Sequence, residues 1–142
     1  MPYVRAGDIF NDLRRIAPNL SFSTHWQEDP SYVWDGDGPD PADDGMVAYD
    51  VRVVARAIVD GVLAEGRQSL GGAYDYPDKR DPDVHGYLPQ MLEEAAQELA
   101  AKVSGPLKSQ CAAAIKYLTG VMKKNYEADR RSYSKTQSRR RR

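Results

Sequence analysis

Residues 49–59 read YDVRVVARAIV and are followed by Asp60-Gly61, and this stretch sets the fold of the chain. Its odd positions, from Tyr49 to Val59, are all apolar or aromatic, and three of its even positions carry a charge. Alternation with a period of two and many β-branched residues is typical of a strand with one buried face. Asp60-Gly61 predicts a two-residue turn, because both central residues of a type I′ turn need positive φ. The sequence therefore predicts a β-hairpin over about residues 49–74.

Folding the chain at this turn determines which residues face each other across the hairpin. The predicted pairs are Val59 with Val62, Ile58 with Leu63, Ala57 with Ala64 and Arg56 with Glu65. One face of the hairpin then carries a charge pair. The other face carries small residues, against which a helix could pack closely: Ala55, Ala57, Ala64 and Gly66.

The segment before the hairpin predicts one helix, one strand and a long loop. Apolar residues at helical spacing predict a helix over 7–17, capped by Gly7 or Asp8 and ended by Pro18. Residues 20–26 alternate and contain aromatics, which predicts a strand, and residues 32–34 are expected to extend it or pair with it. Residues 35–45 consist of Asp, Gly and Pro with few exceptions, so they predict a loop.

Two further helices are predicted after the hairpin. The first begins near Pro89, buries an apolar stripe that reaches Val103, and ends at Ser104-Gly105-Pro106. The second runs from Pro106 to about Arg130. Its apolar residues fall at alternating four- and three-residue steps, the spacing of a helix-packing seam: Leu107, Cys111, Ala114, Leu118 and Val121. The sequence leaves open whether this seam packs on its own domain or on another chain.

The predicted order is therefore α-β-β-β-α-α, an α+β fold in which a three-stranded antiparallel sheet packs on helices. Residues 1–128 are expected to form a single domain. Residues 129–142 form a basic tail that has almost nothing apolar to bury, so we expect it to be disordered when free.

This layout resembles the double-stranded-RNA-binding domain over about residues 8–103. The similarity is best in Val51-Arg52-Val53, Asp60-Gly61 and the EGRQS stretch at 65–69, which an Ala-rich helix follows. The resemblance implies an α-β-β-β-α topology. In that family a lysine cluster at the start of the second helix grips phosphates, whereas this chain has LPQMLEE at residues 88–94. Carboxylates in that position would repel RNA.

Charge is distributed very unevenly along the 142 residues. Residues 1–100 hold 8 Lys/Arg and 19 Asp/Glu, whereas residues 101–142 hold 12 Lys/Arg and 2 Asp/Glu. The asymmetry indicates an acidic body and a basic arm with separate roles, or two parts that attract each other or serve solubility. The chain has no apolar run of the length that spans a bilayer, and its single cysteine favours a reducing, cytoplasmic location.

No motif for metal binding or catalysis is complete. Asp35-Gly36-Asp37-Gly38 is similar to the start of a calcium loop, but Pro39 and Met46 stand where that loop needs ligands. His25 and His85 lack the spacing of a zinc pair, and no nucleophile has a base beside it. We therefore expect a protein without a cofactor that is not an enzyme, and keep a small hydrolase using His25 or His85 only as a remote alternative.

Two binding signals remain. The first is an acidic stretch with aromatics, which suits a protein interface that competes with nucleic acid, unless both tryptophans belong to the core. Its residues are Trp26, Tyr32, Trp34, Asp35, Asp37, Asp40, Asp43 and Asp44. The second is a set of cations that suits phosphates, unless it only keeps the chain soluble. Its residues are Lys123, Lys124, Arg130, Arg131, Arg139, Arg140, Arg141 and Arg142.

These signals predict a protein that acts by binding. In style it resembles phage or mobile-element accessory proteins that inhibit a host nucleoprotein machine, such as anti-CRISPR proteins, with an acidic surface contacting the partner. The alternative is a nucleic-acid-associated structural or virion assembly protein, anchored by its arginine-rich tail.

Overall fold

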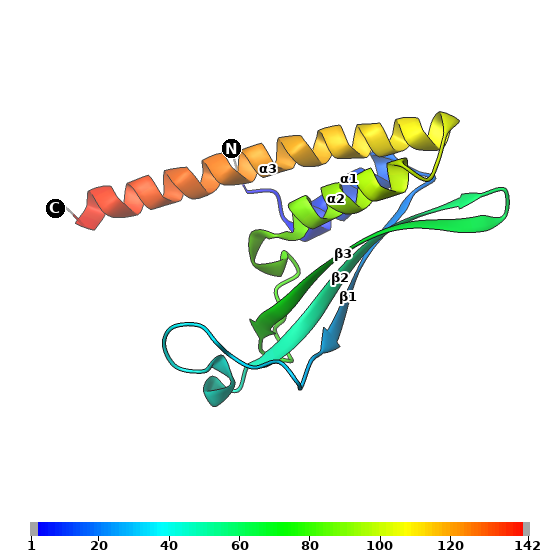
Figure 1. The fold of residues 1–142 in the computed structure, drawn as a ribbon. Helices are drawn as coiled ribbons and strands as arrows, with labels where there is room; N and C mark the ends of the chain where they lie inside the picture. Colours follow the sequence, from blue (N-terminus) through cyan, green and yellow to red (C-terminus); the bar gives the residue numbers. More distant parts are fainter. Residues whose placement is uncertain (1–2, 141–142) are drawn as a thin grey trace.

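The computed structural model describes residues 3–140, with side chains as far as Arg130 (Figure 1). The elements are α1 (Ala6–Ile16), β1 (Ser21–Glu28), β2 (Val47–Val59), β3 (Val62–Asp75), α2 (Leu88–Ala100) and α3 (Gly105–Arg140), with two short 3-10 helices, η1 (Pro41–Asp44) and η2 (Val84–Gly86). The three strands form one antiparallel sheet in the order β1-β2-β3. The predicted α+β class and element order are confirmed.

The hairpin turns where the sequence predicts it. Asp60 and Gly61 have φ values of 52° and 78°, as a type I′ turn requires. All four predicted cross-strand pairs are present, from Val59 opposite Val62 to Arg56 opposite Glu65. The ladder extends beyond the predicted ends, to Val47 opposite Asp75.

One irregularity in the hairpin was not predicted. Tyr49 pairs with Ala73 and Val51 pairs with Leu70, so two glycines, Gly71 and Gly72, stand opposite a single residue of β2. An extra residue of this kind bends a strand and increases its twist. Gly72 has a φ of 70°, which glycine adopts without strain.

The face of the sheet that α2 covers, called here the closed face, carries the predicted small residues. At Gly66 the helix is so close that a Cβ atom would lie 2.0 Å from the Ala95 carbonyl oxygen and 2.7 Å from the Leu99 nitrogen. Ala55 and Ala57, also on this face, are buried. The predicted close approach of a helix to these residues is confirmed.

The helices form two layers behind the sheet (Figure 1). α2 packs on β2 and β3, α1 contacts β1, and α3 lies across α1 and α2. Four seam residues of α3 are fully or almost fully buried: Cys111, Ala114, Leu118 and Val121. The seam thus packs within its own domain, which answers the question that the sequence left open.

Polar contacts also fix α3 to the N-terminal segment. The buried Asn125 side chain accepts a hydrogen bond from the Val4 N–H at 2.7 Å and donates one to the Val4 carbonyl at 3.1 Å. The Tyr117 hydroxyl donates to the Asp12 carboxylate. Burial and this carboxylate raise the pKa of Tyr117 well above its usual value.

Three predicted boundaries differ from the structure. α2 ends at Ala100, a few residues before Ser104-Gly105-Pro106, where the sequence predicted its end. Residues 32–34 do not join the sheet, and the reason is that their aromatic rings pack on its end instead. α3 ends at Arg140 rather than near Arg130, where the sequence predicted its end. Nothing after Gly120 ends a helix, because the chain has no further Gly or Pro, and each added residue extends an existing hydrogen-bond ladder.

Candidate functional site

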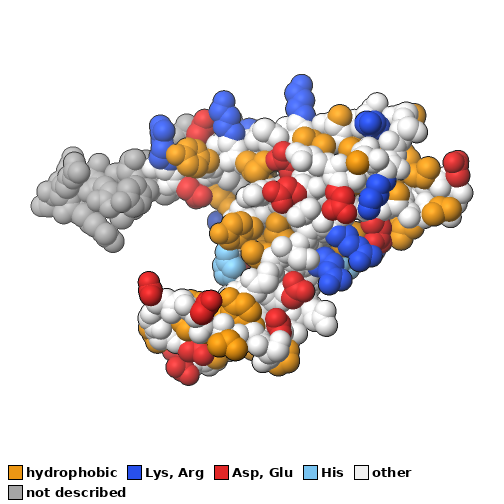
Figure 2. Space-filling model, viewed as in Figure 1, with side chains coloured by type: hydrophobic (Ala, Val, Ile, Leu, Met, Phe, Trp, Pro, Cys, Tyr) orange, Lys and Arg blue, Asp and Glu red, His pale blue; other side chains and the backbone are white. Residues whose placement is uncertain are grey.

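The segment between β1 and β2 forms a separate lobe at one end of the sheet (Figure 1). We call residues 29–45 the acidic lobe, because they contain six aspartates and no Lys or Arg. Figure 2 shows carboxylates on this lobe, at the lower left of the view, over apolar side chains. The lobe contains seven of the eight residues that the sequence predicted as a partner-binding surface.

Aromatic rings attach the acidic lobe to the hairpin. Tyr32 and Trp34 both pack edge-on against Tyr74 of β3, with ring centroids 5.8 and 5.7 Å apart. The Tyr32 ring occupies the space that a Cβ at Gly72 would need, only 2.4 Å away. The glycine at position 72 of the bulge therefore makes room for the lobe.

Hydrogen bonds within the lobe hold its backbone in defined turns. The Trp34 ring covers Gly36, and its Nε1 donates to the Gly38 carbonyl at 3.4 Å. The Asp29 carboxylate accepts from the Ser31 hydroxyl at 2.6 Å, and the Asp40 carboxylate caps η1 by accepting from the Ala42 N–H at 2.9 Å. Two of the six aspartates thus stabilise turns.

The other four aspartates point their charge into solvent. Asp35, Asp37, Asp43 and Asp44 are exposed, and within residues 3–130 no cation lies within ion-pair distance of them. The charge of the lobe also acts on the adjacent ring: burial raises the pKa of Tyr74, and the charges of Asp40 and Asp35 raise it further. The lobe is therefore a preformed surface of negative potential.

Trp26 does not belong to this lobe. It lies on β1, where its ring packs edge-on against Tyr49 at 5.4 Å, and the Arg80 guanidinium stands 5.7 Å from both ring centroids. Trp26 and Trp34 are each half-buried. The aromatic residues thus hold the lobe and the sheet in place, and the negative surface consists of the aspartates.

The second predicted surface lies on α3. Lys123 and Arg130 share its solvent side with Lys108 and Lys116, since steps of eight, seven and seven residues at 100° per residue keep all four within one 80° sector. We call these four residues the basic stripe; Figure 2 shows Lys and Arg side chains along the outer edge of α3. Lys124 is exposed about 100° further round the helix.

Most of the predicted tail residues cannot be placed on a surface. The backbone of Arg131, Arg139 and Arg140 belongs to α3, but their side chains lie outside the described part of the structure. Arg141 and Arg142 lie outside the described residues altogether.

The two histidines lie in different places. His25 is exposed on β1, where its Nε2 is 3.0 Å from the Ser23 hydroxyl. His85 lies between two carboxylates, with Nε2 3.1 Å from Asp75 and Nδ1 3.8 Å from Asp81. This cluster crosslinks a turn in which Val84 and His85 have φ values of 51° and 54°, a strained geometry that the sequence did not reveal. Within residues 3–140 no group of three or more His, Cys, Asp or Glu could hold a metal ion.

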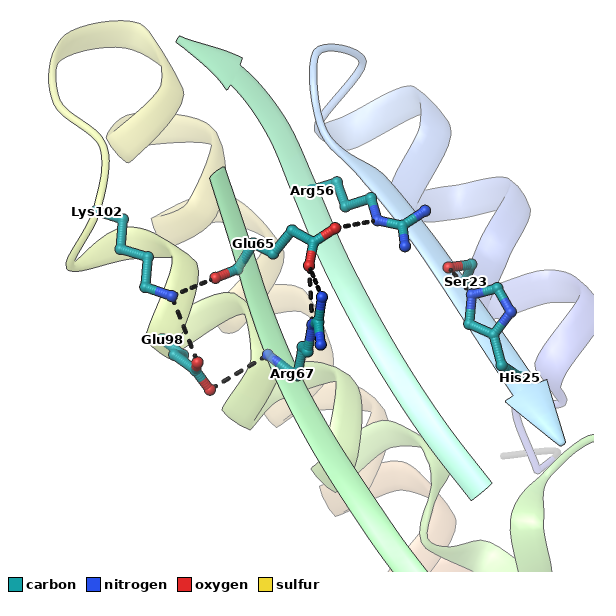
Figure 3. A network of polar contacts seen from close by, with 7 residues as sticks. All are labelled: Ser23, His25, Arg56, Glu65, Arg67, Glu98 and Lys102. Carbon is teal, nitrogen blue, oxygen red and sulfur yellow. Dashed lines mark hydrogen bonds and ion pairs between the residues drawn. The ribbon is translucent and has the colours of Figure 1, made fainter. Parts of the chain in front are cut away.

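A third polar surface lies on the side of the sheet opposite α2, where the sequence predicted a charge pair, and we call it the open face (Figure 3). Glu65 lies at its centre, with its Oε1 accepting from Arg56 Nε at 2.8 Å and its Oε2 from Arg67 Nε at 2.8 Å. Hydrogen bonds from Arg67, and secondarily from Arg56, hold the pKa of Glu65 below its usual value. The predicted pairing of Arg56 with Glu65 placed a charge pair on this face, but it could not show that β1 adds to it.

Side chains of α2 and of the turn after it cap the outer edge of β3 beside this network (Figure 3). Glu98 accepts a hydrogen bond from the Arg67 N–H at 3.2 Å, and Lys102 Nζ donates to the Glu65 carbonyl at 2.6 Å. An edge strand with free N–H and C=O groups is a template for pairing with another chain, and these contacts block it at two residues.

Comparison with protein-family models, curated proteins and solved structures finds no match to this chain. In the part of the chain that the structure describes, no helix combines the length and the apolar character needed to cross a membrane.

Proposed function

We propose that this protein acts by binding, and that its acidic lobe docks on a basic surface of a partner protein. A nucleoprotein machine has such surfaces for the phosphates of its nucleic acid, so a small phage or mobile-element protein that occupies one would act as an inhibitor, in the manner of anti-CRISPR proteins. The observation that carries the proposal is a set of four exposed aspartates that pair with no cation among residues 3–130, on a lobe held by the Tyr32–Trp34–Tyr74 contacts.

Docking costs less free energy when less order has to be created on binding. A flexible acidic loop would lose conformational entropy when it docks, whereas a loop already fixed by ring packing and turn hydrogen bonds loses less. Concentrated charge of one sign also accelerates the encounter with a surface of the opposite sign. Binding of this kind weakens as salt is added.

The test is a variant in which Asp35, Asp37, Asp43 and Asp44 are all replaced by Asn. Asp40 is kept, because it caps η1. Tagged protein is used to capture partners from nuclease-treated host lysate, and the captured protein is then purified so that its affinity can be measured. Removing four charge-assisted contacts together should weaken binding at least about 100-fold.

The matched control replaces four exposed carboxylates outside the lobe: Asp8, Asp60, Asp78 and Asp129, each by Asn. It changes net charge by the same amount, so it separates the lobe from the overall charge of the chain. Equal affinity of the lobe variant and the control would contradict the proposal.

A second candidate function is binding of nucleic acid by α3, as in a virion or ribonucleoprotein assembly protein. It is favoured by the basic stripe, which places four cations on one side of a helix over 22 residues, or about 33 Å. Replacing Lys116 and Lys123 with Gln, or truncating the chain after Ala128, should weaken binding to a DNA duplex. The slope of log affinity against log salt should fall by nearly one for each phosphate that the variant no longer neutralises. Unchanged affinity and slope would exclude the stripe.

A further inference from the structure

We propose that the open face of the sheet holds a binding site for a phosphate group, separate from both the acidic lobe and the basic stripe. Residues 1–100 contain only eight Lys/Arg, and three of them, Arg52, Arg56 and Arg67, line one depression on this face. The depression has a volume of about 230 Å³ and is also lined by His25.

The strand register brings these side chains together. Arg52 lies opposite His25 of β1, Val54 lies opposite both Ser23 of β1 and Arg67 of β3, and Arg56 is one alternation further along β2. Val54 is only 2% exposed although it faces away from the helices, because the polar side chains around it cover it. The depression thus has an apolar floor and a cationic rim.

Much of the donor capacity on this rim is uncommitted. Glu65 takes only Nε of Arg56, which leaves both terminal nitrogens of that guanidinium without a hydrogen-bond partner among the described residues. In the part of the chain with described side chains, Arg52 has a single ionic contact, to Asp50 at 4.0 Å, which is too long for a hydrogen bond. Because Glu65 bonds both Arg56 and Arg67, it orients two guanidiniums and leaves donors for a further anion.

The chemistry of the rim selects the ligand class. A guanidinium presents paired N–H groups that match the oxygens of phosphate. The rim carries three guanidiniums and the two carboxylates of Asp50 and Glu65, so its net charge is positive. None of the described residues that line the depression is a Phe, Tyr or Trp on which a base could stack. We infer that a phosphate is recognised, either free, in a nucleotide, or in the backbone of a nucleic acid.

The test is an NMR titration of the full chain with sodium phosphate, using sodium chloride at the same ionic strength as the reference. Adenosine monophosphate and a single-stranded oligonucleotide of about ten nucleotides are titrated next. Shifts are expected in the Nε–H signals of Arg52, Arg56 and Arg67 and in the amides around them. Tighter binding of the oligonucleotide supports the site with a nucleic-acid backbone as the source, and equal binding of all three probes supports it with a free phosphate.

Arg52→Gln is the decisive variant, because the only ionic contact of Arg52 within residues 3–130 is the long one to Asp50, so the fold does not depend on it. Removing one charge-assisted contact should weaken phosphate binding about tenfold. Arg56→Gln together with Arg67→Gln should weaken it further; if that pair unfolds the chain, R52Q decides alone. Arg14→Gln, on the exposed side of α1, is the control and should bind as the wild type does.

Two results would overturn the proposal. One is that phosphate produces no more shift than chloride, so that the arginines only cover Val54. The other is that the shifts fall on α3 and disappear in the variant with Lys116 and Lys123 replaced by Gln, while R52Q binds normally. Neither result bears on the proposed function of the acidic lobe, because that proposal is tested separately by measuring how its variants bind the captured partner.

Discussion

The two faces of the hairpin share one backbone hydrogen-bond ladder, but one is stabilised by close packing and the other by polar contacts. On the closed face Gly66, Ala55 and Ala57 leave room for α2, and the helix backbone comes within atomic contact of the strand. On the open face Arg56 and Arg67 reach over the sheet and both donate hydrogen bonds to the carboxylate of Glu65. Side-chain size is therefore decisive on one face and side-chain charge on the other.

This difference has an energetic consequence. A packed interior cannot absorb an added atom without moving a neighbour, whereas long polar side chains can rearrange when a neighbour changes. The open face can therefore accept the substitutions that a binding site needs, and the closed face cannot. Three predictions test this contrast.

Gly66→Ala should have the largest effect. The added Cβ would stand 2.0 Å from a helix carbonyl oxygen, so α2 must shift, and we expect a loss of about 3 kcal/mol of unfolding free energy. Gly71→Ala is the control on the same strand, since nothing lies within 4 Å of its Cβ position, and its effect should be about 0.5 kcal/mol or less. Urea denaturation measures both; equal losses would refute the close-packing argument.

A smaller contrast is expected between neighbouring valines of β2. Val53, on the closed face, and Val54, on the open face, are exposed by 0% and 2%. Val53→Ala leaves a cavity in a rigid core and should lower the unfolding free energy by about 2–3 kcal/mol. At position 54 the aliphatic parts of the arginine side chains can fill the space that the valine leaves, so Val54→Ala should lower it by about 1 kcal/mol. Similar costs in thermal denaturation would show that the open face is as rigid as the closed one.

The charge of Glu65 should have the smallest effect. Because its folded-state pKa is lower than its ordinary value of 4.5, the ionised carboxylate stabilises the fold above pH 4.5. That contribution is lost as the pH falls through the folded-state pKa. The melting temperature of the wild type should exceed that of Glu65→Gln at about pH 6 to 7, and the difference should shrink below pH 4.5. Arg67→Gln should flatten the same part of the profile, and a difference that does not change with pH would contradict a role for the ionised carboxylate.

Elements with a local cause could be predicted from the order of residues alone. The turn at Asp60-Gly61 and the alternation of β2 are short-range preferences, so they set the hairpin register and the small-residue face. Pro18 likewise marked the end of a helix, because proline acts on its own backbone. The acidic character of residues 29–45 and the basic character of α3 were also legible in the sequence.

Which side chains meet could be learned only from the folded domain. A long connection separates β1 from β2, so no local rule places His25 opposite Arg52, or shows that β1 contributes to the depression that the hairpin arginines line. The anchoring of Tyr32 and Trp34 on Tyr74 depends on the bulge at Gly71-Gly72, and the strained turn at Val84 depends on contacts with Asp75 and Asp81. Such contacts join residues that are distant in sequence. Their free energy outweighs the local conformational preferences of the chain only when the whole domain has packed.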